Sequence, residues 1–428
     1  MYLTSYFKAS LAILTKFNFA AILPQHFFGN IYISYKTGIY KMFEKLVKKN
    51  LLESLNKIEY GQLQLTTPED DTIFTKGGKP GPTADLKLND WRTVVNLKLK
   101  ADIGFAADYR DGYWETSDLK SLILLGLENE QAFGQYMEPN IFFKILQKLG
   151  YLTKRNNIKQ SKKNIHAHYD LGNEFYKLWL DKTMTYSSAL YKNDDETLEQ
   201  AQINKYQNII DKFDKKGGSI IEIGCGWGGF AETALNNGNY SVKGITLSQE
   251  QHDYAKDRLA GKNTDIVIED YRIQEGKYDY LVSIEMIEAV GREYWSTYFS
   301  KLKSLIKQDG KIIIQSIVID DKLFADYAKG TDMIRTFIFP GGFLPSIEQI
   351  NLELDKLGLK CINKEFFGKD YAKTLDEWDR NFINVEQDLI KLGFDKRFQR
   401  MWRFYLNSCS AAFTHGRIDV AQLEIVHA

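Results

Sequence analysis

The group of residues best suited to binding a ligand is a glycine-rich loop, Ile221-Glu-Ile-Gly-Cys-Gly-Trp-Gly-Gly-Phe230. An apolar run leads into this loop and a helical pattern follows it, which predicts a strand, a tight turn and a helix. Gly224 and Gly226 lack a Cβ atom, so the backbone can turn sharply there and approach a ligand closely. The spacing of Gly224, Gly226 and Gly229 also satisfies the G-x-G-x-x-G pattern, so the loop alone indicates a nucleotide-type ligand without identifying it.

The end of the next predicted strand helps to distinguish the possible nucleotides. A nicotinamide-binding protein usually has an acid there, ~20 residues after the glycines, to bind ribose hydroxyls. Residues 244–248 contain no acid, although Thr246 and Gln251 could bind a ribose through neutral groups. The third strand ends at Glu269-Asp-Tyr-Arg272, which offers an acid for an adenine amino group and an aromatic ring to stack on it. A nicotinamide oxidoreductase is therefore the least favoured reading.

The histidines and cysteines do not indicate a metal centre. His166 and His168 resemble a ligand pair, but the other histidines are scattered and the three cysteines do not cluster. A small, odd number of cysteines argues against a disulfide framework and favours a reducing compartment. Cys409 lies in an apolar helical segment, where a cysteine is more often a packing residue than a nucleophile.

The elements that would position the glycine loop form an alternating pattern. From about residue 167, strands alternate with helices, which predicts a parallel sheet with helices on both faces. The predicted strands are 219–223, 240–246, 265–269, 279–284 and 311–315, and residues 422–426 suit a closing strand. Residues 320–410 are predicted to be mostly helical, with Asp395 as a helix N-cap.

Three segments are expected along the chain. With 428 residues the chain is too long for one ordinary core. We expect an N-terminal domain over residues 1–150, in which Gly77-Gly-Lys-Pro-Gly-Pro82 marks turns between short strands. A basic linker over residues 151–166 and a catalytic domain over residues 167–428 complete the chain.

Overall charge does not point to a charged partner. Lysine and arginine together number 56, as do aspartate and glutamate, so the net charge does not favour nucleic acid. The segment Tyr6–Tyr35 is rich in apolar residues, but polar residues interrupt it before the ~20 needed to span a bilayer. We expect a cytoplasmic protein that associates peripherally with the inner face of the membrane.

Seven ordered motifs give the sequence a specific resemblance. They are His168-Tyr-Asp-Leu-Gly-Asn173, Met184-Thr-Tyr-Ser-Ser188, Glu222-Ile-Gly-Cys-Gly-Trp-Gly-Gly229, Gly244-Ile-Thr-Leu-Ser-Gln249, Glu285-Met-Ile-Glu-Ala-Val-Gly291, Phe339-Pro-Gly-Gly-Phe-Leu-Pro345 and Tyr405-Leu-Asn-Ser-Cys409. With this order and spacing, the chain resembles the cyclopropane-fatty-acyl-phospholipid synthases and is similar to the mycolic acid cyclopropane synthases. The match runs from about residue 165 to the C-terminus and continues more weakly through the N-terminal domain.

The resemblance implies a class I S-adenosylmethionine-dependent methyltransferase. This fold is Rossmann-like, with a seven-stranded, mostly parallel sheet and helical lid insertions; a smaller α+β domain would precede it. By motif position, the family's cofactor contacts fall on Tyr186, Ser187, Gly224, Cys225, Gly226, Gly228, Thr246, Leu247, Gln251, Tyr271 and Arg272.

The resemblance also implies a bicarbonate ion beside the reacting methyl group, acting as the base. Its ligands would fall on Ser188, Glu288, Gln315 and Tyr371, and Cys409 matches a cysteine historically labelled as the active residue. The chain departs from the common pattern, because Ser188 replaces a cysteine and Gln315 replaces a histidine. Serine and glutamine can still donate hydrogen bonds to an anion.

The chemistry implied by the resemblance begins with an alkene, a weak nucleophile, and a sulfonium methyl group, an electrophile. Attack leaves a carbocation, which aromatic faces can stabilise. Phe337, Phe339 and Phe343 are candidates for that wall, although aromatic residues more often only fill cores. A base must then remove a proton, and Glu288 follows the fourth strand, where open α/β sheets place ligands.

Three functions remain open at this stage. The favoured one is formation of a cyclopropane ring on an unsaturated phospholipid acyl chain within a membrane. The alternatives are a methyl or methylene branch made from the same cation, and a non-catalytic lipid-binding relative. The basic segment Lys41–Lys49 could contact anionic headgroups. The resemblance suggests a homodimer.

Overall fold

The computed structural model describes residues 45–137 and 171–428. The chain divides into two compact units, Met1–Glu53 and Ser54–Ala428. Residues 45–55 are helical. The apolar segment Tyr6–Tyr35, the predicted linker 151–166 and the pair His166 and His168 lie outside the described residues. In the part of the chain that is described, no helix is both long and apolar enough to cross a membrane.

The N-terminal part of the larger unit contains a four-stranded sheet in the order β2-β1-β3-β4. Its strands are β1 (Tyr60–Thr66), β2 (Thr72–Lys76), β3 (Lys79–Leu88) and β4 (Trp114–Glu115), followed or interrupted by helices α3 (Arg92–Arg110), α4 (Leu119–Glu128) and α5 (Glu130–Met137). β2 is antiparallel and β3 parallel to β1.

The glycines and prolines that predicted turns in this region have two different roles. Gly77 and Gly78 separate β2 from β3, as expected, but Pro80 and Pro82 lie within β3. The register against β1 shifts at this point, between Tyr60 and Gln62, and β4 pairs only with the far end of β3. Proline is tolerated there because no neighbouring strand needs its missing N–H group.

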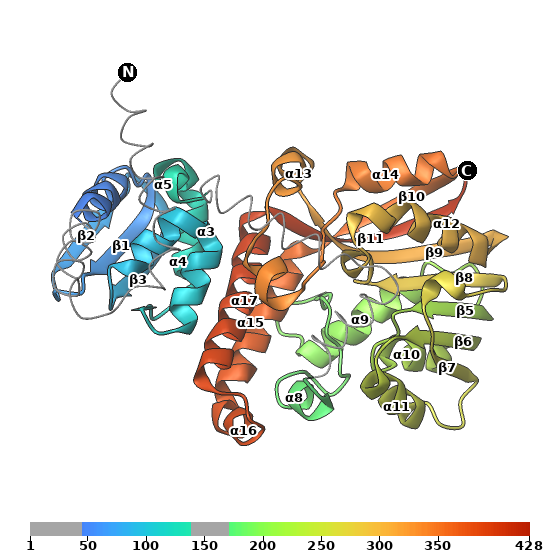
Figure 1. The fold of residues 1–428 in the computed structure, drawn as a ribbon. Coiled ribbons are helices and arrows are strands. Elements are labelled where there is room, and N and C mark those ends of the chain that lie inside the picture. The colour runs from blue at the N-terminus through green and yellow to red at the C-terminus, as the bar shows by residue number, and fades with distance from the viewer. Residues whose placement is uncertain (1–44, 138–170) are drawn as a thin grey trace, which may run out of the picture. The chain divides into compact units, whose positions relative to one another are not determined.

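The catalytic part of the chain contains the seven-stranded, mostly parallel sheet that the sequence predicted. Its order is β10-β11-β9-β8-β5-β6-β7 (Figure 1). The strands are β5 (Gly217–Ile223), β6 (Asn239–Thr246), β7 (Thr264–Ile268), β8 (Tyr278–Ile284), β9 (Ile306–Ile319), β10 (Leu359–Phe366) and β11 (Ile418–His427). Only β11 runs against its neighbours, β9 and β10.

The helices of this part follow the strands closely. They are α8 (Asn173–Lys177), α9 (Leu198–Ile210), α10 (Gly229–Asn237), α11 (Gln249–Arg258), α12 (Trp295–Leu305), α13 (Asp321–Tyr327), α14 (Ile347–Lys356), α15 (Gly368–Asn384), α16 (Glu386–Lys391) and α17 (Lys396–His415), with short 3-10 turns at Tyr271–Ile273, Ile287–Ala289 and Arg292–Tyr294 and a π turn at Ile334–Ile338. The long helices α15 and α17, which follow β10 and precede β11 along the chain, lie side by side (Figure 1).

Alternation along the central strands explains why the sheet is covered on both faces. Ile312 and Ile314 belong to one core cluster, whereas Ile313 belongs to the cluster on the opposite face. Successive side chains of a strand point to opposite faces, so an unbroken isoleucine run buries both. β10, by contrast, lies in a region predicted to be helical. It is an edge strand with mostly exposed residues, so it lacks a clear apolar alternation.

Candidate active site

A single pocket lies at the carboxyl ends of β5, β6, β7 and β8, where open α/β sheets place their ligands. Most of the residues predicted to contact the cofactor line it, namely Tyr186, Ser187, Gly224, Cys225, Gly226, Thr246, Leu247, Gln251, Tyr271 and Arg272. Gly228 is not among the lining residues. It begins α10 with φ +82°, and a Cβ there would press on Leu259 and Ala255 of the neighbouring helix region.

The far end of the pocket carries the groups expected for a nucleoside. Thr246 Oγ1 donates to Gln251 Oε1 at 2.9 Å, so the two neutral groups are held together. Tyr271 is buried and its hydroxyl has no hydrogen-bond partner in the described chain. Arg272 donates to both carboxylate oxygens of Asp270, at 2.8 and 2.6 Å, so that acid is already paired.

The sequence reasoning did not single out Glu222 as a pocket residue. It lies on β5 just before the glycine loop, is 2% exposed and lines the pocket. Its Oε2 atom has no hydrogen-bond partner among the described residues, and burial raises the pKa of its carboxyl well above the usual range. An acid directly before the first glycine was the available signal. Glu222 can accept a hydrogen bond from a ligand.

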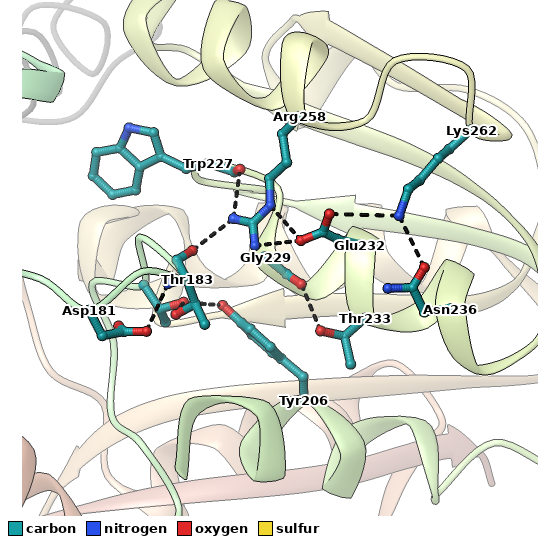
Figure 2. A network of polar contacts seen from close by, with 11 residues as sticks. Asp181, Thr183, Tyr206, Trp227, Gly229, Glu232, Thr233, Asn236, Arg258 and Lys262 are labelled. Carbon is teal, nitrogen blue, oxygen red and sulfur yellow. Dashed lines mark hydrogen bonds and ion pairs between the residues drawn. The ribbon is translucent and has the colours of Figure 1, made fainter. Parts of the chain in front are cut away.

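Arg258 at the end of α11 ties the two loops of the pocket together. Its guanidinium donates to the backbone oxygen of Thr183 at 2.7 Å and to that of Trp227 at 3.4 Å, and it pairs with Glu232 of α10 at 2.7 Å (Figure 2). Lys262 adds a longer contact of 3.7 Å to Glu232. One partly buried cation therefore fixes the glycine loop relative to the loop that carries Tyr186 and Ser187.

A chain of hydroxyl groups supports the same loop from the other side. Thr183 and Thr185 share a hydrogen bond of 2.7 Å, and Thr185 contacts the Tyr206 hydroxyl of α9 at 2.8 Å (Figure 2). Thr183 N donates to Asp181 at 2.8 Å. These contacts position the loop, and Thr185 and Tyr206 also line the pocket.

We predict that Arg258→Met weakens binding of S-adenosylmethionine by about tenfold and lowers the free energy of unfolding by about 2 kcal/mol. The substitution leaves the Thr183 and Trp227 carbonyls without a donor. Calorimetric titration and chemical denaturation would measure the two effects. Lys262→Met is the matched control, because its partly exposed contact should contribute less than about 1 kcal/mol. Equal effects of the two substitutions would contradict the assigned role of Arg258.

Three of the four residues expected to bind an anion do converge, but on another residue of the chain. Ser188 N and Gln315 Nε2 each donate to Glu285 Oε1 at 2.8 Å. The Tyr371 hydroxyl donates to Glu285 Oε2 at 2.7 Å. Glu285 is the first residue after β8 and lines the cofactor pocket. It stands in a motif that the sequence analysis quoted, yet it was not chosen, because Glu288 matched the family's position.

Glu288, the fourth expected ligand, has separate partners. Its Oε1 atom accepts hydrogen bonds from Ile317 N and from Ser316 Oγ, the latter at 3.1 Å, and its Oε2 atom has no partner among the described residues. Burial, and then the nearby Glu285 carboxylate, raise the pKa of Glu288 to about 8. Because Glu285 accepts three hydrogen bonds, we assign the negative charge to Glu285 and the proton to Glu288.

This protonation state predicts a pH-dependent stability. Folded Glu288 holds a proton that the unfolded chain releases above its ordinary pKa of 4.5, so the free energy of unfolding falls as pH rises from there to about 8. The change in the free energy of unfolding caused by Glu288→Gln should therefore be more favourable at pH 8 than at pH 5, by about 1–3 kcal/mol. Urea denaturation of both proteins at the two pH values measures this difference. A difference that does not change with pH would rule out a neutral Glu288.

Cys409 lies on α17 and is partly exposed. Burial raises the pKa of the Cys409 thiol to about 12, with a smaller contribution from Asp332. A thiol that stays protonated near neutral pH is a poor nucleophile.

The candidate phenylalanines occupy different surroundings. Phe343 packs against Trp295 and Tyr327 in the core beneath the sheet. Phe339 meets the Tyr405 ring edge to face at 5.8 Å, and the Arg110 guanidinium lies 5.9 Å from the Phe337 ring. Phe343 is therefore a core residue.

The fold and pocket define a class I S-adenosylmethionine-dependent methyltransferase, as the sequence predicted. Residues 156–423 match the model of the mycolic acid cyclopropane synthetase family, and the chain belongs to this family.

Sequence relatives can be aligned with most of the chain. The tuberculostearic acid methyltransferase of Mycobacterium tuberculosis is 33% identical over 76% of this chain and 78% of its own. The cyclopropane-fatty-acyl-phospholipid synthase of Escherichia coli is 32% identical over 82% of this chain and 89% of its own. The structure of a mycolic acid cyclopropane synthase in complex with SAH and CTAB superposes with a TM-score of 0.58, at 30% identity over 62% of this chain and 97% of that one.

Proposed function

We propose that this enzyme transfers a one-carbon unit from S-adenosylmethionine to the double bond of an unsaturated phospholipid acyl chain and closes a cyclopropane ring. The observation that carries the proposal is the position of the Glu285 carboxyl group, which lines the cofactor pocket and accepts hydrogen bonds from three separate parts of the chain. A base beside a methyl donor suits chemistry in which a methyl group is transferred and then deprotonated.

The pocket residues fit the cofactor. When bound, S-adenosylmethionine supplies an electrophilic methyl group on a positively charged sulfur. Glu222 has a carboxyl oxygen with no partner among the described residues, which can accept a hydrogen bond from an amino group, and Thr246 with Gln251 offers neutral partners for ribose hydroxyls. Tyr271 offers a buried ring to stack on the adenine of the cofactor, and its hydroxyl has no partner among the described residues.

Aromatic side chains connect Tyr186, which lines the pocket, to α17. The Tyr186 and Tyr405 hydroxyls share a hydrogen bond of 2.8 Å, and the Trp378 ring lies 5.2 Å from that of Tyr186. Tyr371 stacks on Phe413 at 4.5 Å. Such rings attract a developing carbocation and exclude water, which would otherwise trap it.

The bicarbonate ion that the resemblance implies does not fit this site. Three of its expected donors, on Ser188, Gln315 and Tyr371, are already used by the Glu285 carboxylate. The fourth expected ligand, Glu288, accepts its own hydrogen bonds from Ser316 and Ile317. A second anion would find no open donor there and would lie against an existing negative charge.

A second product is favoured by one of the comparisons. The tuberculostearic acid methyltransferase is as similar to this chain as the cyclopropane synthase is, and its name describes a methyltransferase and not a cyclopropane synthase. If the hydrogen on the methylated carbon first moves with its electron pair to the neighbouring cation, loss of a proton from the new methyl group to the same base gives a methylene branch. A branched acyl chain is thus the second candidate.

The test is mass spectrometry of lipids from a host rich in monounsaturated chains, with and without expression of this protein. We expect each modified chain to gain one methylene unit and to lose its double bond. The same mass gain with the double bond retained would establish the branched product instead. Unchanged lipids from a protein that binds the cofactor would contradict both candidates.

We further propose that the enzyme acts as a homodimer bound peripherally to the inner face of the membrane. Lys45, Lys48 and Lys49 lie on the helical segment 45–55, and a lysine near an anionic surface contributes about 1 kcal/mol to binding. Reversing all three charges should reduce co-sedimentation with anionic vesicles more than tenfold. Reversing Lys322, Lys360 and Lys364, which are exposed on the catalytic part, is the control. Equal losses in the two triple variants would contradict a local docking site.

A further inference from the structure

We propose that the Glu285 carboxylate is itself the catalytic base, built into the chain at the place where the resemblance implies a bound bicarbonate ion. This inference rests on the proposed function and names the group that removes the proton. It assigns that role to a residue that the match to the family had not selected.

The site is constructed around an anion. Ser188 lies in the loop before α9, Gln315 lies on β9 and Tyr371 lies on α15. Donors from three separate parts of the chain therefore converge on one carboxylate. Ser188 and Gln315 are fully buried, and Tyr371 is 5% exposed. Buried donors converge in this way only where their hydrogen bonds are satisfied by a specific acceptor.

A second layer of contacts fixes the direction of these donors. Gln422 of β11 donates to Gln315 Oε1 at 3.0 Å, so the NH₂ group of Gln315 must face Glu285. Thr374 of α15 accepts a hydrogen bond from Ala189 N at 3.1 Å, which places Ser188 N beside Tyr371. The arrangement therefore does not depend on a freely rotating side chain.

The backbone of Glu285 is held in an unusual conformation. Its φ angle is +50°, a region that non-glycine residues rarely adopt, and its N–H donates to Gln315 O at 2.7 Å. A left-handed residue other than glycine costs about 1–2 kcal/mol. A glycine would occupy this position without that cost, so the retained glutamate indicates that the side chain has a use.

Charges around the carboxylate suit a base. Burial raises the pKa of Glu285, which makes it a stronger base than a surface glutamate, while Tyr371, the buried Lys205 and the other donors favour its ionised form. Lys205 is fully buried, donates to Ser187 Oγ at 2.6 Å and has a pKa lowered to about 7 by burial. Glu288 holds the remaining proton of the pair.

The proposed step balances. As the alkene carbon bonds to the methyl group, the sulfur–carbon bond breaks and its electron pair stays on sulfur. The cation forms on the neighbouring carbon of the acyl chain. A proton then passes from the new methyl group to a Glu285 oxygen, and the released C–H electron pair closes the ring. The carboxyl gives its proton to water before the next turnover.

Glu285→Gln tests the role directly, with unsaturated phospholipid vesicles as substrate. Glutamine still accepts a hydrogen bond but cannot take the proton, so we expect kcat to fall by about 10²–10⁴-fold while the Kd for S-adenosylmethionine changes less than about threefold. Glu353→Gln, a carboxyl on α14 with one unpaired oxygen, is the matched control and should retain its activity. A Glu285→Gln enzyme with more than about a tenth of the original kcat would overturn the proposal.

Glu285→Gly provides a second test. Its result is a recovery of activity, which a misfolded variant could not show. Glycine suits the φ of +50° and leaves space for an anion among the same three donors. We expect added bicarbonate to raise the activity of this variant at least tenfold, in a saturable manner. The absence of any rescue, with the variant folded and binding the cofactor, would argue against a base held at this position.

A binding measurement separates this inference from the proposed function. Carbon-13 bicarbonate should bind to the SAH complex of Glu285→Gly and not to that of the original protein, whether or not the lipid substrate is correct. Equal binding to both proteins would overturn the inference. A wild-type protein that modifies no lipid but shows the expected binding difference would overturn only the proposed substrate.

Discussion

The active site depends on one buried carboxylate and the donors that hold it. An ionised carboxylate away from water needs several hydrogen bonds to be stable. Glu285 obtains them from Ser188, Gln315 and Tyr371, which are far apart in the sequence. The helices inserted between β10 and β11 are required for this, because α15 carries Tyr371 to the end of β8. The hydrogen bonds to Glu285 thus hold the proposed base at the wall of the cofactor pocket.

The two neighbouring carboxyl groups divide their roles by environment. Glu285 faces three donors and the positive charge of Lys205, whereas Glu288 accepts fewer hydrogen bonds and has its pKa raised to about 8. The hydrogen bonds therefore favour the ionised form at Glu285, whereas the raised pKa of Glu288 favours its neutral form near pH 7. Environments that separate the pKa values of two nearby acids are a common way to assign one base and one neutral partner.

Much of the fold was predictable because its signals are local. The isoleucine run of β9 and the glycine loop after β5 identified the sheet and the cofactor pocket, and Asp395 does cap α17. β10 was missed because an edge strand with polar residues on both sides lacks a periodic pattern. The arrangement around Glu285 was missed for a different reason. A match of motifs places residues in order along the chain, but only the folded backbone shows which of two glutamates three residues apart meets Tyr371.

The most direct test of the built-in base is the dependence of wild-type activity on bicarbonate. Turnover of unsaturated phospholipid vesicles would be measured in buffer stripped of carbon dioxide, and again after bicarbonate is restored. We predict that kcat changes less than about twofold, because the proton acceptor is part of the chain. Loss of most activity on stripping, and its recovery with bicarbonate, would show that an external anion is the base and would contradict the account.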